Sequence, residues 1–230
     1  MKRIGLIGGM SWESTLVYYR EIQEGVRARL GGLHSADLVL HSLDFAPIAS
    51  LQHAGDWETL GKILASSAEI LERAGATAVL LCTNTMHKVA PAIEAVVRIP
   101  LLHIADATEE KIREAGLRTV GLLGTRFTME DDFYRRRLEE RFGLEVLVPE
   151  KPDRDEVHRV IYEELVVGKI TPASKQTYLE IVDRLIGRGA EGIIFGCTEI
   201  GLLLSADDLP VPAFDTTRIH AQAAVDWILG

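Results

Sequence analysis

Short apolar runs alternate along this chain with longer segments whose apolar residues recur every three or four positions. In chain order, the runs are 4–7, 36–43, 77–81, 101–104, 119–123, 145–148 and 192–195. Apolar runs of this length, separated by segments of helical periodicity, predict β-strands connected by crossover helices. Because such crossovers join parallel strands, we expect an α/β fold whose mainly parallel sheets are flanked by helices.

The segments between the runs have the periodicity and the end signals of helices. Residues 14–30 carry apolar residues at helical spacing, which predicts a helix; these are Leu16, Tyr19, Ile22, Val26 and Leu30. The other predicted helices are 57–74 after the N-cap Asp56, 86–97, 129–142 after Thr128, 155–167, 172–188 beginning at Pro172, and 217–229. Aspartate is a favoured N-cap residue, and proline is well tolerated in a first helical turn.

The second half of the sequence repeats the plan of the first. Residues 4–9 match residues 120–125, and residues 78–83 match residues 192–198 with one inserted residue. Such a repeat predicts two similar folding units, each built from the same order of strands and helices.

We therefore expect two pseudo-symmetric α/β lobes with a ligand cleft between them. The N-terminal lobe is predicted over 1–110 and the C-terminal lobe over 111–230, with the boundary falling near 106–118. The last helix, over 217–229, is expected to pack back on the first lobe.

Composition narrows the classes of function. Of the 230 residues, 47% are hydrophobic and 26% are charged, which is ordinary for a soluble globular enzyme. The formal net charge is −9 and no stretch is dense in lysine and arginine, which argues against a nucleic-acid partner. No apolar run approaches the ~20 residues of a membrane span, and the start of the chain does not resemble a targeting segment. We expect a cytoplasmic protein, in a compartment where thiols stay reduced.

Candidate chemistry centres on the two cysteines of the chain. Cys82 follows a predicted buried strand and opens a helical stretch, which is where open α/β sheets bind ligands. The dipole of the following helix is expected to favour a thiolate. Thr83, Asn84 and Thr85 add hydroxyl and amide groups that, together with free backbone N–H groups, suit a carboxylate.

Cys197 repeats this placement in the second half. Thr198 and Glu199 follow it, and the Glu199 carboxylate is suited to bind a substrate ammonium or to tune the thiol. Gly8 lies 74 positions before Cys82, and Gly124 lies 73 before Cys197. Either cysteine alone would be interpreted as a small buried hydrophobe, but two at equivalent positions of a repeat indicate a paired role.

A pair of thiols suits the inversion of a stereocentre, which needs an acid and a base on opposite faces of one carbon. Sulfurs about 3.5 Å from that carbon would lie roughly 7 Å apart, too far for a disulfide. A thiol titrates close enough to neutral pH to serve as base in one direction and acid in the other. We hypothesise that Cys82 and Cys197 are these two groups.

Other chemistries have less support. The glycine-rich start, residues 5–11, is not a G-x-G-x-x-G fingerprint and no P-loop is present, so these glycines are expected to let the backbone approach a small ligand. No lysine is singled out as a pyridoxal phosphate anchor, and we expect neither a cofactor nor a metal. None of five histidines shows metal-ligand spacing, and each is expected to be an ordinary core or surface residue; they are His34, His41, His87, His103 and His220.

The segments GGMSWEST at 8–15, CTNTMH at 82–87 and GCTEI at 196–200 closely resemble the aspartate/glutamate racemase family. The likeness covers essentially the whole chain. It implies two pseudo-symmetric lobes with the active site between them, pyridoxal-independent racemisation of an amino acid, and a homodimer. It also implies that Cys82 and Cys197 are the acid–base pair. The substrate contacts it implies are Met10, Gln52, Thr83, Asn84, Thr85, Thr125 and Thr198, with Gln52 placed in a loop after the second strand.

Specificity and rival functions stay open at this point. Family members that act on an acidic amino acid need a cation for its distal carboxylate, and some carry a basic residue on the segment equivalent to 161–167. This chain reads the acidic IYEEL over 161–165, which argues against a strict aspartate preference and leaves glutamate, another amino acid or broad specificity open. A maleate isomerase or an arylmalonate decarboxylase of the same superfamily is the main alternative. A non-catalytic two-lobed binding protein and a redox pair of cysteines are the others.

Overall fold

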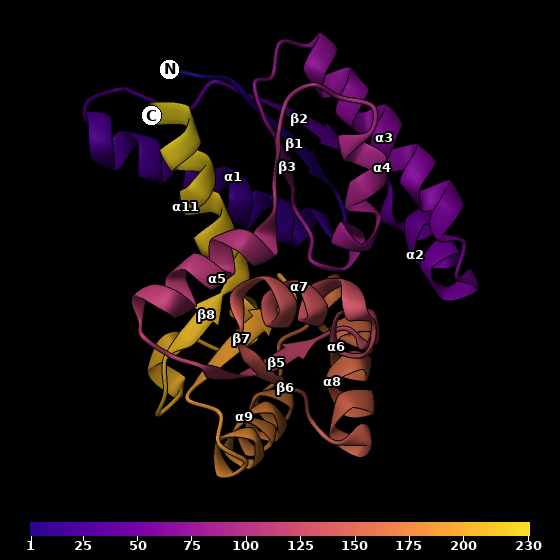
Figure 1. Cartoon of the computed structure of the whole chain (residues 1–230), viewed down its shortest axis with the longest axis vertical. Helices are drawn as coiled ribbons and strands as arrows, with labels where there is room; N and C mark the ends of the chain where they lie inside the picture. The colour runs from indigo at the N-terminus through magenta and orange to yellow at the C-terminus, as the bar shows by residue number, and fades with distance from the viewer. The chain divides into compact units, whose positions relative to one another are not determined.

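The structure is a computed structural model that describes all 230 residues. The chain forms two compact units. The first contains Met1–Ile104 and His220–Gly230, and the second contains Ala105–Ile219. Each unit holds a four-stranded parallel sheet with helices on its faces (Figure 1). The predicted α/β class is confirmed. No helix has both the length and the apolar content that crossing a membrane requires.

The first sheet has the strand order β2-β1-β3-β4. Its strands are β1 (Ile4–Gly8), β2 (Leu38–Ser42), β3 (Val79–Leu81) and β4 (Leu101–Leu102). All neighbours are parallel, with Ile7 opposite both His41 and Leu81. β1 is buried along its whole length, as expected of a central strand covered on both faces.

Two groups of helices cover the faces of this sheet. On one face, α1 (Trp12–Leu30) and α11 (Thr216–Leu229) pack against the apolar cluster that contains Ile4, Leu6 and Leu80. The other face packs against the helices around Ile7, Val79 and Leu81. These helices are α2 (Phe45–Ala54), α3 (Trp57–Arg73), the 3-10 helix η1 (Thr85–Val89) and α4 (Ala90–Glu94).

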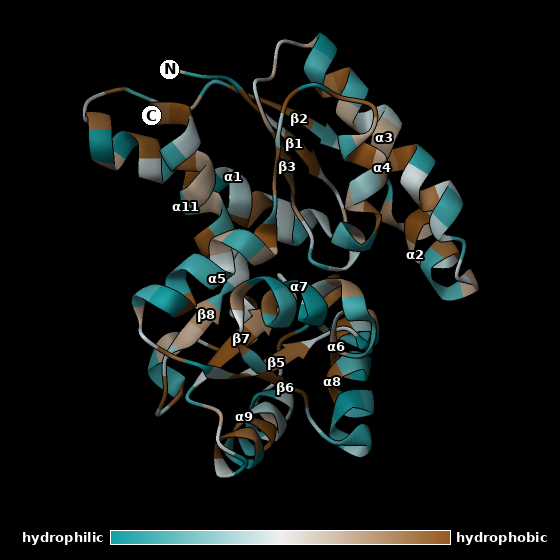
Figure 2. Cartoon of the chain, in the orientation of Figure 1, coloured by the Kyte–Doolittle hydropathy of each residue, from teal (hydrophilic) through white to brown (hydrophobic).

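The second sheet repeats this order as β6-β5-β7-β8. Its strands are β5 (Thr119–Gly124), β6 (Glu145–Leu147), β7 (Gly192–Gly196) and β8 (Ala213–Asp215). The helices of this unit are α5 (Ile104–Glu114), α6 (Arg126–Glu130), α7 (Asp132–Phe142), α8 (Lys151–Glu163), η2 (Leu165–Val167), α9 (Pro172–Gly187), α10 (Ile200–Leu203) and η3 (Ala206–Asp208). In Figure 2 the central strands are hydrophobic, whereas α7 is mostly hydrophilic.

Three predicted helices differ from those observed. The helix predicted over 129–142 is two helices, because Asp131 takes an extended conformation between α6 and α7. Thr125, not Thr128, caps the first of them by accepting the N–H of Thr128. The helix predicted over 155–167 begins at Lys151 and gives way to η2, and the one predicted over 86–97 is the pair η1 and α4.

Helix α2 was not predicted. Pro47 lies in its first turn, where a helix needs no backbone N–H from the residue, and Asp44 caps it by accepting the N–H of Ala46. Strand β8 was also missed.

The turn between β1 and α1 explains one of the early glycines. Gly9 has φ +89°, and a Cβ placed on it would lie 2.2 Å from the carbonyl oxygen of Leu43. The space beside Gly9 is therefore filled by the backbone that follows β2. The sequence suggested approach to a ligand, but the close neighbour of this glycine is the protein's own chain.

We predict that Gly9→Ala lowers the free energy of unfolding by at least about 3 kcal/mol, because positive φ and a backbone clash both penalise a Cβ. Gly55→Ala is the control. Gly55 has φ +72° with no atom within 4 Å of the added Cβ, so it should lose about 1 kcal/mol. Urea unfolding measures both, and equal losses would contradict the steric explanation.

Helix α11 places a fully buried histidine in the first unit. The His220 Nε2–H donates to the carbonyl oxygen of Leu102 at 2.8 Å, and its Nδ1 lies 3.0 Å from the Tyr18 hydroxyl. Burial lowers the pKa of His220 to about 4 from its ordinary 6.5, against the raising effect of the Leu102 carbonyl. The ring is thus neutral in the folded protein at neutral pH.

This burial predicts a specific acid sensitivity. Between pH 6.5 and 4 the unfolded chain takes up a proton at His220 that the folded chain refuses, so stability is full above 6.5 and falls by roughly 3 kcal/mol on the way to 4. His220→Gln should remove this part of the slope in urea unfolding measured across that range. A substitution of the exposed His34, His34→Gln, should leave the slope unchanged, and the same slope in both variants would refute the assignment.

Candidate active site

The strand order of each sheet brings two strand ends together at a reversal of the winding. From β1 the chain moves outward to β2 and then returns to the other side of β1 as β3. Ligands of open α/β sheets bind at such a reversal, beyond the carboxyl ends of the strands. Cys82 is the first residue after β3, and its backbone N–H donates to the Ile7 carbonyl at 2.9 Å. In the second unit, Thr125 and Cys197 follow β5 and β7 in the same way.

The first unit gathers most of the predicted contacts at this edge of its sheet. Met10 lies just beyond β1, and Thr83, Asn84 and Thr85 follow Cys82 directly, all of them buried. Thr83, Asn84 and Thr85 thus bring two hydroxyl groups and one amide to the end of β3.

The placement of Gln52 was wrong. It lies on α2 and not in a loop, and it is buried, with 3% of its surface exposed. Its Nε2 donates to the Sδ of Met86, at 3.1 Å, four residues after Cys82. Gln52 therefore contacts the helix that the Cys82 segment opens.

The Cys82 thiol is enclosed by apolar side chains. The residue has no exposed surface and belongs to the cluster that contains Tyr18, Leu80 and Ala221. Burial raises the pKa of the thiol far above its ordinary range. The helix dipole was expected to favour a thiolate, but only the short 3-10 helix η1 follows, and desolvation outweighs it. In this structure Cys82 is a neutral thiol.

The Cys197 thiol has a polar neighbour. Its Sγ–H donates to the Glu199 Oε2 at 2.9 Å, and the Thr198 hydroxyl donates to the same oxygen at 2.9 Å. Glu199 is itself buried. Burial first, and then the negative charge of Glu199, raise the pKa of Cys197 well above its usual value. This thiol is also neutral, but it has a carboxylate beside it that can accept its proton.

The inserted residue of the second half places the two thiols on different faces of their sheets. When the two sheets are aligned by their strand registers, Cys82 is equivalent to Gly196, and Cys197 is therefore one residue beyond the position equivalent to Cys82. Because side chains alternate across a strand, Cys82 joins the cluster under α1 and α11, whereas Cys197 joins Phe195 in the cluster under α8 and α9. The cysteines match in the sequence repeat but do not occupy equivalent surroundings.

The sequence did not single out Tyr162 or His158 on α8. Tyr162 packs against the apolar cluster that contains Cys197, and its ring lies 4.7 Å from that of His158. Burial, and then the proximity of Cys197 and Glu199, raise the pKa of the Tyr162 phenol. The Nδ1 of His158 accepts the backbone N–H of Arg126, next to Thr125, at 3.2 Å. Tyr162 is therefore a neutral phenol near Cys197 and Glu199.

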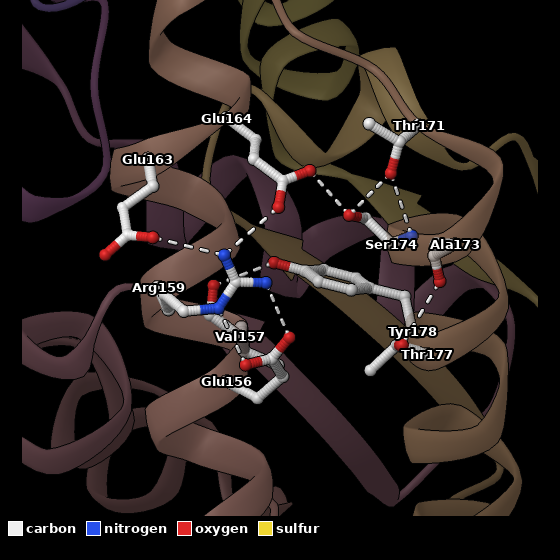
Figure 3. A network of polar contacts seen from close by, with 10 residues as sticks. All are labelled: Glu156, Val157, Arg159, Glu163, Glu164, Thr171, Ala173, Ser174, Thr177 and Tyr178. Carbon is white, nitrogen blue, oxygen red and sulfur yellow. Dashed lines mark hydrogen bonds and ion pairs between the residues drawn. The ribbon is translucent and has the colours of Figure 1, made fainter.

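The acidic residues toward the end of α8 share one cation, Arg159, from their own helix. Arg159 donates two hydrogen bonds to Glu156, at 2.9 and 2.7 Å, and one each to Glu163 and Glu164 (Figure 3). The Ser174 hydroxyl donates to Glu164 at 2.6 Å, and this bond, followed by that of Arg159, lowers the pKa of the Glu164 carboxyl. Of these carboxylates, Glu164 is the one that joins the end of α8 to α9.

Known proteins resemble this chain in sequence and in fold. The sequence model of the Asp/Glu/Hydantoin racemase family matches residues 7–224. The crystal structure of a candidate Asp/Glu racemase from Yersinia pestis is 55% identical, with a TM-score of 0.93 and 100% of each chain covered. An aspartate racemase homologue from Pyrococcus horikoshii OT3 is 37% identical, with a TM-score of 0.87 and the same coverage.

One of the relatives is named for its range of substrates. The broad specificity amino-acid racemase RacX of Bacillus subtilis (strain 168) is 22% identical over 234 residues, which cover 98% of each chain. Together with the match over 7–224, these likenesses extend across both sheets and both cysteine segments. The chain belongs to the Asp/Glu/Hydantoin racemase family.

Proposed function

We propose that this protein is a cofactor-independent amino-acid racemase in which Cys82 and Cys197 exchange protons with the α-carbon. One observation supports it above the others. In a racemase-family chain with two cysteines, each cysteine directly follows the strand beside the winding reversal of its own sheet. Two such ends are where a small ligand binds in this class of fold.

The proposed reaction moves one proton off and one proton on. The thiolate of one cysteine removes the α-proton and becomes a thiol, leaving a carbanion conjugated with the substrate carboxylate. The thiol of the other cysteine donates its proton to the opposite face and becomes a thiolate. The product is the mirror image of the substrate, and the reverse reaction uses the same groups in exchanged roles.

Binding of the substrate has to supply the thiolate, because burial keeps both thiols neutral. The α-ammonium group of an amino acid brings a positive charge that favours a nearby thiolate. Glu199, at 2.9 Å from the Cys197 sulfur, is placed to take the proton of that thiol or to bind the ammonium. Cys82 lies among apolar side chains, so its thiol suits the acid role in the first turnover.

The proposed substrates are α-amino acids, with aspartate, glutamate or a broader range of side chains. The side chains of Thr83, Asn84 and Thr85, directly after Cys82, are the proposed donors to the α-carboxylate. The broad specificity of the Bacillus subtilis relative supports a range wider than the two acidic amino acids.

The decisive experiment is incubation in D2O with a panel of L-amino acids, aspartate and glutamate included, without added cofactor. We expect loss of the α-proton signal and appearance of the D-enantiomer together, because two-base transfer couples exchange to inversion. Cys82→Ala and Cys197→Ala should each slow racemisation at least about 100-fold. Full activity in both variants would refute the cysteine assignment. Isomerisation of maleate without amino-acid exchange would replace the proposed activity.

A second prediction separates the role of Glu199 from a structural one. Glu199→Gln removes the charge that raises the pKa of Cys197, so the Cys197 thiol should be alkylated faster at neutral pH. Racemisation should nevertheless slow about 10- to 100-fold, because the thiol loses its proton acceptor. Iodoacetamide labelling read by mass spectrometry gives both cysteines at once, with Cys82 as the internal standard. The exposed Glu180→Gln is the control and should change neither rate, and slower alkylation of Cys197 in Glu199→Gln would contradict the assignment.

A further inference from the structure

A histidine that the sequence left without a role is tied to the backbone next to Cys82. The Nδ1 of His87 lies 2.8 Å from the carbonyl oxygen of Thr83, and the backbone N–H of Ile104 donates to its Nε2 at 3.2 Å. A carbonyl oxygen only accepts, so Nδ1 carries the proton. A backbone N–H only donates, so Nε2 carries none. His87 is therefore a neutral imidazole in a single tautomer, and it is buried.

This ring connects the Cys82 segment to the residues that follow β4, the edge strand beside β3. Ile104 comes two residues after β4, and the intervening His103 lies with its ring 4.5 Å from that of His87. At the end of β4, Leu102 accepts the hydrogen bond of His220, which is joined to Tyr18 on α1. The His87 and His220 rings are 5.8 Å apart. Three buried histidines thus lie between the ends of β3 and β4.

Hydrogen bonds hold the Cys82 segment from several sides. The backbone N–H of Cys82 donates to Ile7, and that of Thr83 donates to Leu81, both at 2.9 Å. His87 adds a side-chain donor to the Thr83 carbonyl, one residue after the thiol. This bond fixes the orientation of the peptide that follows Thr83, and so restricts the backbone torsion of the residue next to Cys82.

We infer that His87 is a positioning residue for the Cys82 thiol, acting through its Nδ1–H bond to the Thr83 carbonyl. The inference rests on the proposed function, since a defined thiol position matters only where Cys82 exchanges a proton with a substrate. His87 does not itself transfer the proton. The Ile104 side of the ring sets the tautomer that makes Nδ1 a donor.

Two substitutions separate the two ends of the ring. His87→Asn keeps an amide N–H near the position of Nδ1, and so keeps the bond to Thr83 while losing the acceptor for Ile104. His87→Gln places a carbonyl oxygen near the position of Nε2, and so keeps the acceptor for Ile104 while losing the donor to Thr83. Each variant loses one hydrogen bond of the buried His87 ring, so we expect the two variants to lose a similar amount of stability.

Racemisation kinetics and thiol labelling test the inference. We expect kcat to fall at least about 30-fold in His87→Gln with KM changed less than about threefold, because small misplacements of a reacting group are costly. His87→Asn should keep kcat within about threefold of the parent, since its bond to Thr83 persists. Thermal melting of both variants checks that their losses of stability are alike.

Labelling with iodoacetamide gives a readout that does not need turnover. The rate at Cys82 relative to that at Cys197 should change in His87→Gln and not in His87→Asn. Equal kinetics and equal labelling in the two variants would overturn the inference and leave His87 a structural residue. If the parent protein racemises no amino acid, the proposed function fails, and an unequal labelling ratio would still show that His87 positions the thiol.

Discussion

The order of strands within each parallel sheet is the constraint on which the rest of this structure depends. Because the chain winds outward from the central strand and then returns on its other side, the ends of β1 and β3, and of β5 and β7, have no crossover helix between them. The residues at those ends are free to carry chemistry, since no connection has to cover them. The glycines, threonines and cysteines of the candidate site all lie there, and the helices on the two faces serve to hold the strands in register.

Burial has opposite consequences for packing and for proton transfer. The side chains around Cys82 and Cys197 complete apolar clusters, and the same enclosure makes a thiolate costly. In the proposed reaction, the positive charge of the substrate ammonium offsets part of this cost. The neutral resting thiols also resist oxidation, because the reactive form of cysteine is the thiolate.

Much of the fold could be predicted from the sequence, because seven of the strands are apolar runs flanked by turn residues and most helices have clear periodicity. The failures have local causes. The break between α6 and α7 is a single residue, Asp131, in an extended conformation. Helix α2 was missed because Pro47 lies in its first turn. The position of Gln52 followed from the missed helix. The surroundings of the thiols could not be predicted, because they depend on residues far away in sequence, such as Tyr18 and Ala221 around Cys82. The inserted residue was visible in the repeat, but its effect on which face each cysteine occupies required the register of the strands.

Helix α11 has a consequence for how the chain is made. The first unit contains Met1–Ile104 and the segment from His220 onward, and the 115 residues between these two segments form the second unit. On the ribosome, the second unit emerges as one uninterrupted stretch and can complete its core while synthesis continues. The first sheet emerges earlier but lacks the partner that supplies Ala221, Ala224 and Val225 to its cluster until the residues after 219 are available. The half of the protein that is translated first is therefore the half that finishes folding last, and until then the part of this face that α11 covers, beside α1, stays uncovered.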